Sequence, residues 1–451
     1  MLRQFAAIDR EHLRARIDEE KRRFVDAHPR SKAAFERARA SMLGGVPMNW
    51  MDRWVGGFPV VLEHAEGARA TDIDGHAYVD FCVGDTGAMA GHSPAATVAA
   101  VREQVARGIT AMLPSEDGIW VAEELGRRFG IPKWQFTLTA TDANRFTIRL
   151  ARGITGRPKI LVFNYCYHGS VDETFVVLKD GKVVARDRNV GPPVDLAVTT
   201  RVVEWNDVDG LERELSFGDV ACVLAEPALT NIGMVLPEPG YHDALRELTR
   251  RTGTLLVIDE THTMSSGPGG YTAAHHLQPD FLTVGKALAG GIPWGAYGMT
   301  DEVAARVAAA DIDDTGGIGG TLAANVLSMA AARATLSEVL TEEAYARMIG
   351  LAERYAAGVQ DVIDSNRMPW HIIRLGARAE YGFSAVPPRN GGEAAAAMDH
   401  ELDEYAHLNA LNRGILLTPF HNMALMSPAT TQGDIDAHTE VFAEGVRRLL
   451  A

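Results

Sequence analysis

The sequence predicts an α/β protein, with a large domain built on a mostly parallel sheet between helices and a smaller α+β domain built from both ends of the chain. From about residue 84 to residue 340, short apolar runs alternate with helical segments, which is typical of βαβ units. Before and after this region, the chain consists of helices and short alternating strands. The predicted domains are residues 1–83 (N-terminal helices and meander of the small domain), 84–340 (the large domain) and 341–451 (the C-terminal part of the small domain).

The N-terminal part is predicted to hold helices followed by a small antiparallel sheet. Residues 1–43 have the amphipathic pattern of one or two helices, with Pro29-Arg30-Ser31 as a stop and a new N-cap. Val60–Cys82 alternates apolar and polar residues around an Asp74-Gly75 turn, and this predicts an antiparallel meander.

The central part supplies the parallel sheet. Helices are predicted over Ser93–Gly108 and Ile119–Phe129, and an Ala-rich helix over Thr321–Leu340 closes the domain. The predicted strands are the apolar runs QFTLTAT, KILVFNY, VACVLAEP, LLVIDET, FLTVGK and GAYGMT. The tail is expected to hold short strands at Ile372–Leu375, Tyr381–Ala385 and Gly414–Thr418, and an exposed loop at Gly391–Ala397.

The composition excludes several classes of partner. The 451 residues carry a formal net charge of −15, which argues against a nucleic acid because phosphate backbones are bound by clustered Lys and Arg. No apolar run reaches the length of a membrane span, and the first residues are too charged for a signal peptide. Cys82, Cys166 and Cys222 lie far apart in apolar segments, as reduced core thiols do. We therefore expect a cytoplasmic protein that acts on small molecules.

Two charged residues at strand ends are the strongest functional signal. Asp259 ends the run LLVID and Lys286 follows FLTVG, so each is carried to the sheet edge where ligands of α/β proteins bind. A lysine desolvated by apolar neighbours can form a Schiff base, and an acid can keep a pyridine nitrogen protonated. Taken singly, a surface lysine and a helix cap or structural salt bridge are ordinary explanations. Together, and with Gly-rich loops elsewhere, the two residues favour pyridoxal phosphate.

Five ordered motifs carry a family resemblance. They are LLVIDETHT, FLTVGKALAGG, YCYHGSVDE, LAEPALTNIGMVLPEPGYHDALREL and GGTLAANVLSMAA. In order and spacing, over roughly residues 30–450, they resemble the motifs of class III pyridoxal-phosphate aminotransferases. The N-terminal segment VVLEHAEGARATDIDGHAYVDF most resembles the branch that holds glutamate-1-semialdehyde aminomutase and the β-amino-acid and ω-amine transaminases. The resemblance implies a fold-type I enzyme with a seven-stranded sheet, pyridoxal 5'-phosphate as cofactor, and a homodimer with shared active sites.

The resemblance also implies roles for single residues. By position, Lys286 would form the Schiff base and Asp259 would pair with the pyridine nitrogen. Tyr167 would stack on the cofactor ring, beside His168. Glu226 matches a family position near the ring. It could equally support a residue that contacts the ring, without contacting the ring itself.

The phosphate would lie at the start of a helix. The family's phosphate loop reads Ser-Gly-Thr-Glu-Ala-Asn, and the matching stretch here reads Thr139-Ala140-Thr141-Asp142-Ala143-Asn144. The side chains differ, but the loop still opens a helix whose N–H groups and dipole suit a phosphate, and Thr139 and Thr141 keep hydroxyls. Thr321, in Gly-Gly-Thr, matches a threonine that reaches the phosphate from a neighbouring subunit.

Four residues are candidates for the substrate pocket. A substrate carboxylate needs an arginine fork, and Arg53 and Arg378 are candidates, although each could equally be a surface arginine. Trp50 could wall an apolar pocket or cover a subunit interface. Where this chain reads Gly84-Asp85-Thr86-Gly87, the aminomutase carries Ser-Trp-Gly, and the smaller Thr86 indicates a differently shaped pocket.

Neither a metal site nor a hydrolase site is expected. No metal-ligand spacing such as His-Glu-x-x-His occurs, so the histidines are interpreted as structural residues or as residues that support a site without touching the ligand. A Gly-x-Ser-x-Gly elbow is also absent from the sequence. The histidines considered are His92, His168, His262, His275, His276 and His421.

The expected activity is the ping-pong transfer of an amino group from an amine or an ω/β-amino acid to a 2-oxo acid such as pyruvate, through a Lys286 Schiff base. The alternative is an isomerase on the same scaffold, either an aminomutase of the glutamate-1-semialdehyde type or an amino-acid racemase, which needs no second substrate. A catalytically silent, ligand-binding relative is disfavoured because Lys286, Asp259 and Tyr167 are all present.

Overall fold

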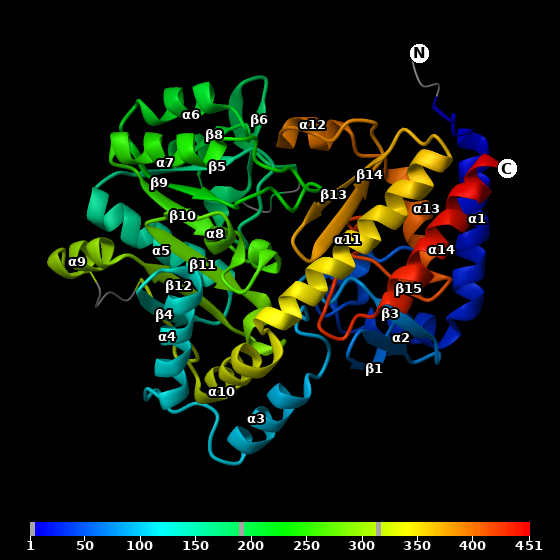
Figure 1. Ribbon diagram of the computed structural model, residues 1–451, viewed down its shortest axis with the longest axis horizontal. Helices are drawn as coiled ribbons and strands as arrows, with labels where there is room; N and C mark the ends of the chain where they lie inside the picture. Colours follow the sequence, from blue (N-terminus) through cyan, green and yellow to red (C-terminus); the bar gives the residue numbers. More distant parts are fainter. Residues whose placement is uncertain (1–4, 188, 190–193, 313–316) are drawn as a thin grey trace. The chain divides into compact units, whose positions relative to one another are not determined.

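The computed structural model describes residues 5–187, 189, 194–312 and 317–451, and Figure 1 shows its helices and strands. The chain forms two compact units. The sheet unit comprises Ala95–Tyr345 and Pro388–Ala396, and the terminal unit comprises Met1–Pro94, Ala346–Pro387 and Ala397–Ala451. None of the described helices combines the length and the apolar character that a membrane crossing needs.

A seven-stranded, mostly parallel sheet forms the centre of the sheet unit, which confirms the predicted fold class. Its order is β4-β12-β11-β10-β9-β5-β8, and β12 runs antiparallel to both neighbours. Strands β9 to β11 are buried along their whole length, which explains their unbroken apolar sequence. The strands are β4 (Lys133–Thr137), β5 (Lys159–Phe163), β8 (Thr200–Val203), β9 (Val220–Ala225), β10 (Leu255–Asp259), β11 (Phe281–Gly285) and β12 (Gly295–Met299), with a separate hairpin of β6 (Val176–Lys179) and β7 (Lys182–Ala185).

Helices pack on this sheet and on one another (Figure 1). Helix α5 lies against β4, β9, β11 and β12, while α6 and α7 pack together beside β8 and β10. Helix α10 packs on α3 and α4. The helices of the sheet unit are α3 (Ala95–Val105), α4 (Glu116–Phe129), α5 (Ala140–Thr155), α6 (Val208–Leu215), α7 (Tyr241–Thr252), α8 (Gly270–Ala274), α9 (Asp301–Ala309), α10 (Val326–Ala334) and α12 (Gly391–Ala396), and α11 (Glu342–Ser365) continues into the terminal unit.

The terminal unit is built from both ends of the chain, as the sequence predicts. The meander forms with the predicted antiparallel pairing, and β15 adds to it parallel to β3, so the two ends share one sheet. Helix α1 packs against α13 and α14 beside this sheet (Figure 1). The elements are α1 (Arg10–Ala27), α2 (Pro29–Ala38), β1 (Leu62–Glu66), β2 (Arg69–Asp72), β3 (Ala77–Asp80), β13 (His371–Leu375), β14 (Arg378–Gly382), α13 (His400–Leu411), β15 (Ile415–Leu416), β16 (Met423–Leu425) and α14 (Gln432–Leu450).

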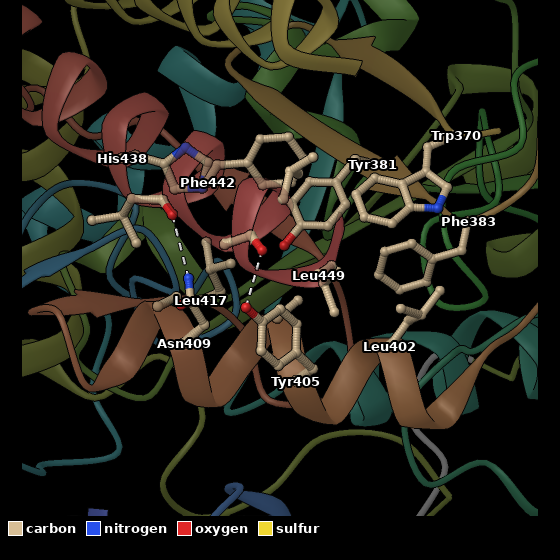
Figure 2. Close-up of a pocket in the computed structure, with 15 residues that line it drawn as sticks. Trp370, Tyr381, Phe383, Leu402, Tyr405, Asn409, Leu417, His438, Phe442 and Leu449 are labelled. Carbon is tan, nitrogen blue, oxygen red and sulfur yellow. Dashed lines mark hydrogen bonds between the residues drawn. The ribbon is translucent and has the colours of Figure 1, made fainter. Parts of the chain in front are cut away.

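An aromatic cavity inside the terminal unit has a structural role. Figure 2 shows Trp370, Tyr381, Phe383 and Phe442 around it, with polar groups of α13 bonded to α14. The Tyr405 hydroxyl donates to the carbonyl oxygen of Gly445 at 3.0 Å. The cavity measures about 20 Å³, which is room for roughly one water molecule, so it is a packing space between helices rather than a substrate site.

The structure differs from the sequence predictions in four local features. Ser31 does not cap α2, because its hydroxyl donates to Asp74 at 2.6 Å and His28 holds the cap position. The Ala-rich helix begins at Val326 rather than Thr321, because Ala324 takes a left-handed φ of 55°. Gly391–Ala396 is a helix rather than a loop. The outermost strand β8 was not among the predicted runs, because it opens with the polar pair Thr-Arg.

Candidate active site

The first turn of α5 is the point at which several predicted cofactor residues meet. Thr139 caps this helix: its hydroxyl accepts from the N–H of Asp142 at 3.2 Å and donates to the Asp142 carboxylate at 3.1 Å. Thr141 Oγ1 accepts from the N–H of Ser170 at 3.0 Å. Because the Thr139 hydroxyl is used within the turn, an anion at this helix start would meet the Thr141 hydroxyl and the N–H groups that lack intrahelical partners.

Two glycines bring other segments against this turn. A Cβ atom at Gly285 would lie 2.9 Å from Ala140 Cβ and 3.0 Å from Ala140 N, so only glycine fits without a shift. A Cβ atom at Gly169, whose φ is 74°, would overlap the side chain of Thr141. Gly285 directly precedes Lys286, and Gly169 directly follows the predicted ring-stacking segment. The two glycines therefore allow both segments to lie close to the start of α5.

Lys286 leaves the sheet in a strained conformation. It follows β11 directly, begins a short 3-10 helix and has a φ of 59°. A left-handed φ at a non-glycine residue costs about 1 kcal/mol or more, and such strain is common at functional sites. Its Nζ lies 2.8 Å from Nε2 of His262. The half-buried ammonium group is thus held at the carboxyl edge of the sheet.

Asp259 is a buried carboxylate with a fixed orientation. It ends β10, is 3% exposed, and its Oδ2 accepts from Asn144 Nδ2 at 2.8 Å and from His168 Nδ1 at 3.0 Å. The N–H of Thr261 donates to Oδ1 at 3.0 Å. The Thr283 hydroxyl donates to Asn144 Oδ1 at 2.7 Å, which orients the amide so that its N–H faces Asp259.

The charges of Asp259 and His168 support each other. Burial disfavours a charge on either group, yet the hydrogen bond and attraction of His168 lower the pKa of Asp259 to about 2. Against the same burial, the Cys166 sulfur and the Asp259 carboxylate raise the pKa of His168 to about 10. At neutral pH, Asp259 is therefore an anion that can pair with a cationic ring nitrogen.

Glu260, the next residue, has a structural role. It is 0% exposed and accepts from the N–H of Tyr271 at 3.1 Å and from the hydroxyl of Thr263 and the N–H of Thr272, both at 2.5 Å. Burial raises the pKa of this carboxyl group. Only Asp259 of the two acids therefore joins the network around Asn144.

Three other predicted cofactor residues, Tyr167, Glu226 and Thr321, also belong to the sheet unit. Tyr167 is half-buried and makes an edge contact with Phe175, with ring centroids 6.2 Å apart. Glu226 follows β9, the neighbour of β10, and accepts from Asn231 at 3.4 Å and from the Thr230 hydroxyl. Thr321 is exposed before α10, and its reach into a neighbouring subunit stays a prediction.

Three residues that bind or orient the groups around Asp259 and Lys286 were not predicted from the sequence. Asn144, which lies in the phosphate motif, binds Asp259 rather than the phosphate loop, and Thr283 orients it. His262 was grouped with the structural or supporting histidines, and its contact with the Nζ of Lys286 was not predicted. A usable signal existed for His262, since it follows Asp259 by three residues in the same motif. Nothing in the sequence pairs Asn144 with a residue so far along the chain.

Two of the predicted substrate residues meet inside the terminal unit. Arg378 Nη2 donates to Thr86 Oγ1 at 2.7 Å, and both residues are 0% exposed. Thr86 has a φ of 79°, a strained value for a β-branched residue. His421 lies 3.3 Å from Glu380 in the same region, and although burial opposes its charge, this carboxylate raises the pKa of His421. Arg378 is therefore an internal arginine and not a surface one.

The other two predicted substrate residues gather around Phe420. Trp50 makes an edge contact with this ring at 5.9 Å, and the Arg53 guanidinium lies over it at 5.7 Å. Arg53 and Phe420 line an open cavity of about 430 Å³ within the terminal unit, together with Trp54 and His407. A cavity of this size has room for a small amino acid.

Comparison with known proteins is consistent with this geometry. The family model for class-III aminotransferases matches residues 50–444. The glutamate-1-semialdehyde 2,1-aminomutase of Neisseria meningitidis serogroup A is 32% identical over 94% of this chain and 100% of its own length. A crystal structure of a glutamate-1-semialdehyde-aminomutase from Pseudomonas aeruginosa PAO1 has 49% identity and a TM-score of 0.96, covering 98% of this chain and 99% of that one, and a variant of it was solved in complex with PMP. An omega-transaminase from Sphaerobacter thermophilus has 28% identity and a TM-score of 0.85, covering 94% of this chain and 98% of that one.

Proposed function

Because the chain belongs to the class-III aminotransferase family, whose cofactor is pyridoxal phosphate, we propose that it is an isomerase of the glutamate-1-semialdehyde aminomutase type. Such an enzyme exchanges an amino group and an oxo group between neighbouring carbons of one substrate. The observation that carries the proposal is the likeness, along almost the whole chain, to proteins with that name. The proposed isomerase activity therefore replaces the activity expected first from the sequence, which was amine transfer to a second substrate.

The proposed cofactor site uses the network of the sheet unit. The first turn of α5 would bind the phosphate, Asp259 would pair with the ring nitrogen, and Lys286 would hold the carbonyl carbon. When bound, the cofactor supplies a conjugated ring that takes up the electrons of a bond broken at the substrate carbon. The space kept free by Gly285 and the permanent negative charge on Asp259 both support this placement.

Lys286 is proposed as the group that moves protons. Its Nζ lies at the sheet edge beside His262, where it can take a proton from one substrate carbon and return it to the neighbouring one. Asn144 and His168 hold Asp259 so that its charge does not have to reorient during the reaction. The half-buried position of Lys286 limits the access of water to that proton.

Arg53 is proposed as the arginine that receives the substrate carboxylate. It lines the open cavity of the terminal unit, whereas Arg378 is enclosed and bonded to Thr86. Phe420 and Trp50 beside it would cover the hydrocarbon part of a small amino acid. For Thr321, we propose contact with the phosphate of a neighbouring subunit, because its side chain is exposed in the single chain.

Amine transfer to a 2-oxo acid is the second candidate. Thr86 favours it, because the resemblance places a larger tryptophan-containing stretch there in the aminomutase. The likeness to an omega-transaminase also supports it. A pocket of different shape beside the same cofactor would accept amines that the aminomutase rejects.

One assay separates the two candidates. The holoenzyme is given glutamate 1-semialdehyde with no acceptor, and the products are followed by nuclear magnetic resonance. An isomerase converts many equivalents into the isomer with exchanged amino and oxo groups. A transaminase releases one equivalent of oxo product per site and stops with the cofactor in its amine form. The Lys286→Ala variant should give neither result, because it lacks the proton carrier.

A further inference from the structure

Three side chains that could hold a metal ion meet in the terminal unit, and none of them belongs to the cofactor network of the sheet unit. His28 is the junction residue between α1 and α2, Asp72 ends β2, and His76 precedes β3 in the same hairpin. One ligand atom of each lies within 4.8 Å of the others. His28 and Asp72 are buried, while the His76 side chain is 41% exposed.

Two of the distances between these atoms are close to the edge lengths of a tetrahedral metal coordination shell. Oδ2 of Asp72 lies 3.4 Å from Nε2 of His28 and 3.2 Å from Nδ1 of His76. Tetrahedral zinc with bonds of about 2.0–2.2 Å requires ligand atoms roughly 3.3–3.6 Å apart. We propose that His28, Asp72 and His76 bind a divalent transition-metal ion such as Zn²⁺, with one position left for water.

The surrounding hydrogen bonds hold His28 in the form that binds a metal. The Nδ1–H of His28 donates to the carbonyl oxygen of Phe24 at 2.7 Å, so Nε2 of the neutral ring presents its lone pair to the site. Metal-bound histidines generally donate their second nitrogen to a carbonyl or carboxylate in this way. The tautomer is therefore set by the fold before any ion arrives.

Tyr78 and His76 supply hydrogen bonds to Asp72, and the Nε2 lone pair of His28 is the group in the cluster that lacks a donor. The Tyr78 hydroxyl donates to Asp72 Oδ2 at 2.6 Å and lies 2.9 Å from His28 Nε2, but its single hydrogen cannot serve both. Among the described residues, the two imidazoles are the only ion-pair partners of the buried Asp72. A cation between the three side chains would satisfy the His28 lone pair and neutralise the carboxylate together.

A metal ion can reach the cluster from the solvent-exposed side of His76. Its Nδ1 faces Asp72, so binding moves the ring hydrogen to Nε2, which solvent can accommodate because the side chain is partly exposed. The bound ion would tie the α1–α2 corner to the β2–β3 hairpin. Asp74 already makes the same connection, since its carboxylate accepts from the N–H groups of Arg30 at 2.7 Å and Ser31 at 2.9 Å.

The test uses tag-free holoenzyme that has been treated with a chelator and then dialysed against Zn²⁺. We expect one Zn²⁺ per chain, a rise of about 2 °C or more in melting temperature, and tetrahedral Co²⁺ absorption bands when cobalt replaces zinc. The His76→Gln variant removes the exposed ligand, and we expect at least a tenfold loss of affinity and no Co²⁺ bands. Its melting temperature without metal should match the wild type, which shows that it folds.

His64→Gln is the matched control, because His64 is an exposed histidine on the neighbouring strand β1 and lies outside the cluster. It should bind Zn²⁺ like the wild type. The proposal is overturned if chelator-treated wild type takes up no Zn²⁺ at micromolar concentration, or if His76→Gln binds as tightly as the control. Neither result would bear on the aminomutase proposal, since the cluster contains no proposed cofactor or substrate residue.

Discussion

The residues around the end of β10 show how the fold stabilises a buried charge, that of Asp259. Asp259 is stabilised by the amide of Asn144, the imidazole of His168 and the N–H of Thr261. Each donor comes from a different segment, so the carboxylate is surrounded before a ligand binds. This arrangement makes Asp259 a fixed negative pole, and its removal should affect chemistry more than folding.

Replacing Asp259 by asparagine should preserve the shape of the side chain and remove its charge. We expect turnover to fall by about a hundredfold or more, because the ring nitrogen loses the anion that keeps it protonated. Steady-state kinetics and the cofactor absorption spectrum measure this. Asp361→Asn, at an exposed position of α11, is the control and should leave turnover unchanged. Equal activity of both variants would contradict the role of Asp259.

The pair of Asp259 and His168 should also give a defined pH dependence of stability. The pKa of His168 is raised to about 10, so its contribution is complete below about pH 6.5, its unfolded value, and is lost as pH rises through about 10. The pKa of Asp259 is lowered to about 2, so its contribution is complete above about pH 4 and is lost as pH falls through about 2.

The comparison is between wild type and His168→Gln, both without cofactor, by urea unfolding near pH 6 and near pH 10. The difference in free energy of unfolding should be largest near pH 6 and should shrink at the higher pH. The exposed residue His64 provides the control, and His64→Gln should show no such change. A difference that grows with pH would have the wrong sign for an ion pair.

At this scale the sequence predicted the charged residues and missed their partners. Asp259 and Lys286 could be placed at strand ends because a charge at the end of an apolar run is a local pattern, and their roles stay predictions. Asn144 and His262 were missed, since their roles come from contacts between segments that only the folded sheet brings together. Thr283 gave no signal at all, because a threonine in a strand is ordinary.

At the scale of elements, the start of α5 organises the site. β11 approaches the start of α5 at Gly285, and the segment after β5 approaches it at Gly169. The next turn of α5 contains Asn144, which binds Asp259. The sequence predicted that a helix opens here and that β11 ends in a lysine. The sequence could not show that the start of α5 and the end of β11 lie in van der Waals contact, because local periodicity does not determine the order of strands in a sheet.

Gly285→Ala tests this contact. Its φ of −158° is available to any residue, so the effect is steric: a new Cβ would press on Ala140. We expect a loss of about 1–3 kcal/mol in free energy of unfolding and weaker cofactor binding. Denaturant unfolding and cofactor titration measure the two effects.

Gly350→Ala is the matched control, since that position lies inside α11 with open space around it. It should raise the free energy of unfolding by about 0.5–1 kcal/mol, because alanine favours a helix. If both variants were stabilised, Gly285 would not be a point of close contact.

At the scale of the whole molecule, the proposed cofactor residues and the predicted substrate residues belong to different units. The sheet unit carries the proposed cofactor residues, and the terminal unit carries the four predicted substrate residues. The sequence predicted the βαβ texture and the terminal unit built from both ends, because alternation and element type are regional patterns. It did not predict the pairing of β15 with β3, nor the meeting of His28 with the β2–β3 hairpin, since these join distant parts of the chain.

The main proposal is that Lys286, which directly follows β11, is the residue that holds pyridoxal phosphate. It is tested most directly by reducing the holoenzyme with borohydride, which makes the carbon–nitrogen bond permanent, and by mapping the modified peptide with mass spectrometry. We expect one pyridoxyl group per chain, on Lys286, and none on that peptide when Lys286→Ala is treated in the same way. A pyridoxyl group on any other lysine of the wild type, or an unmodified chain, would contradict it.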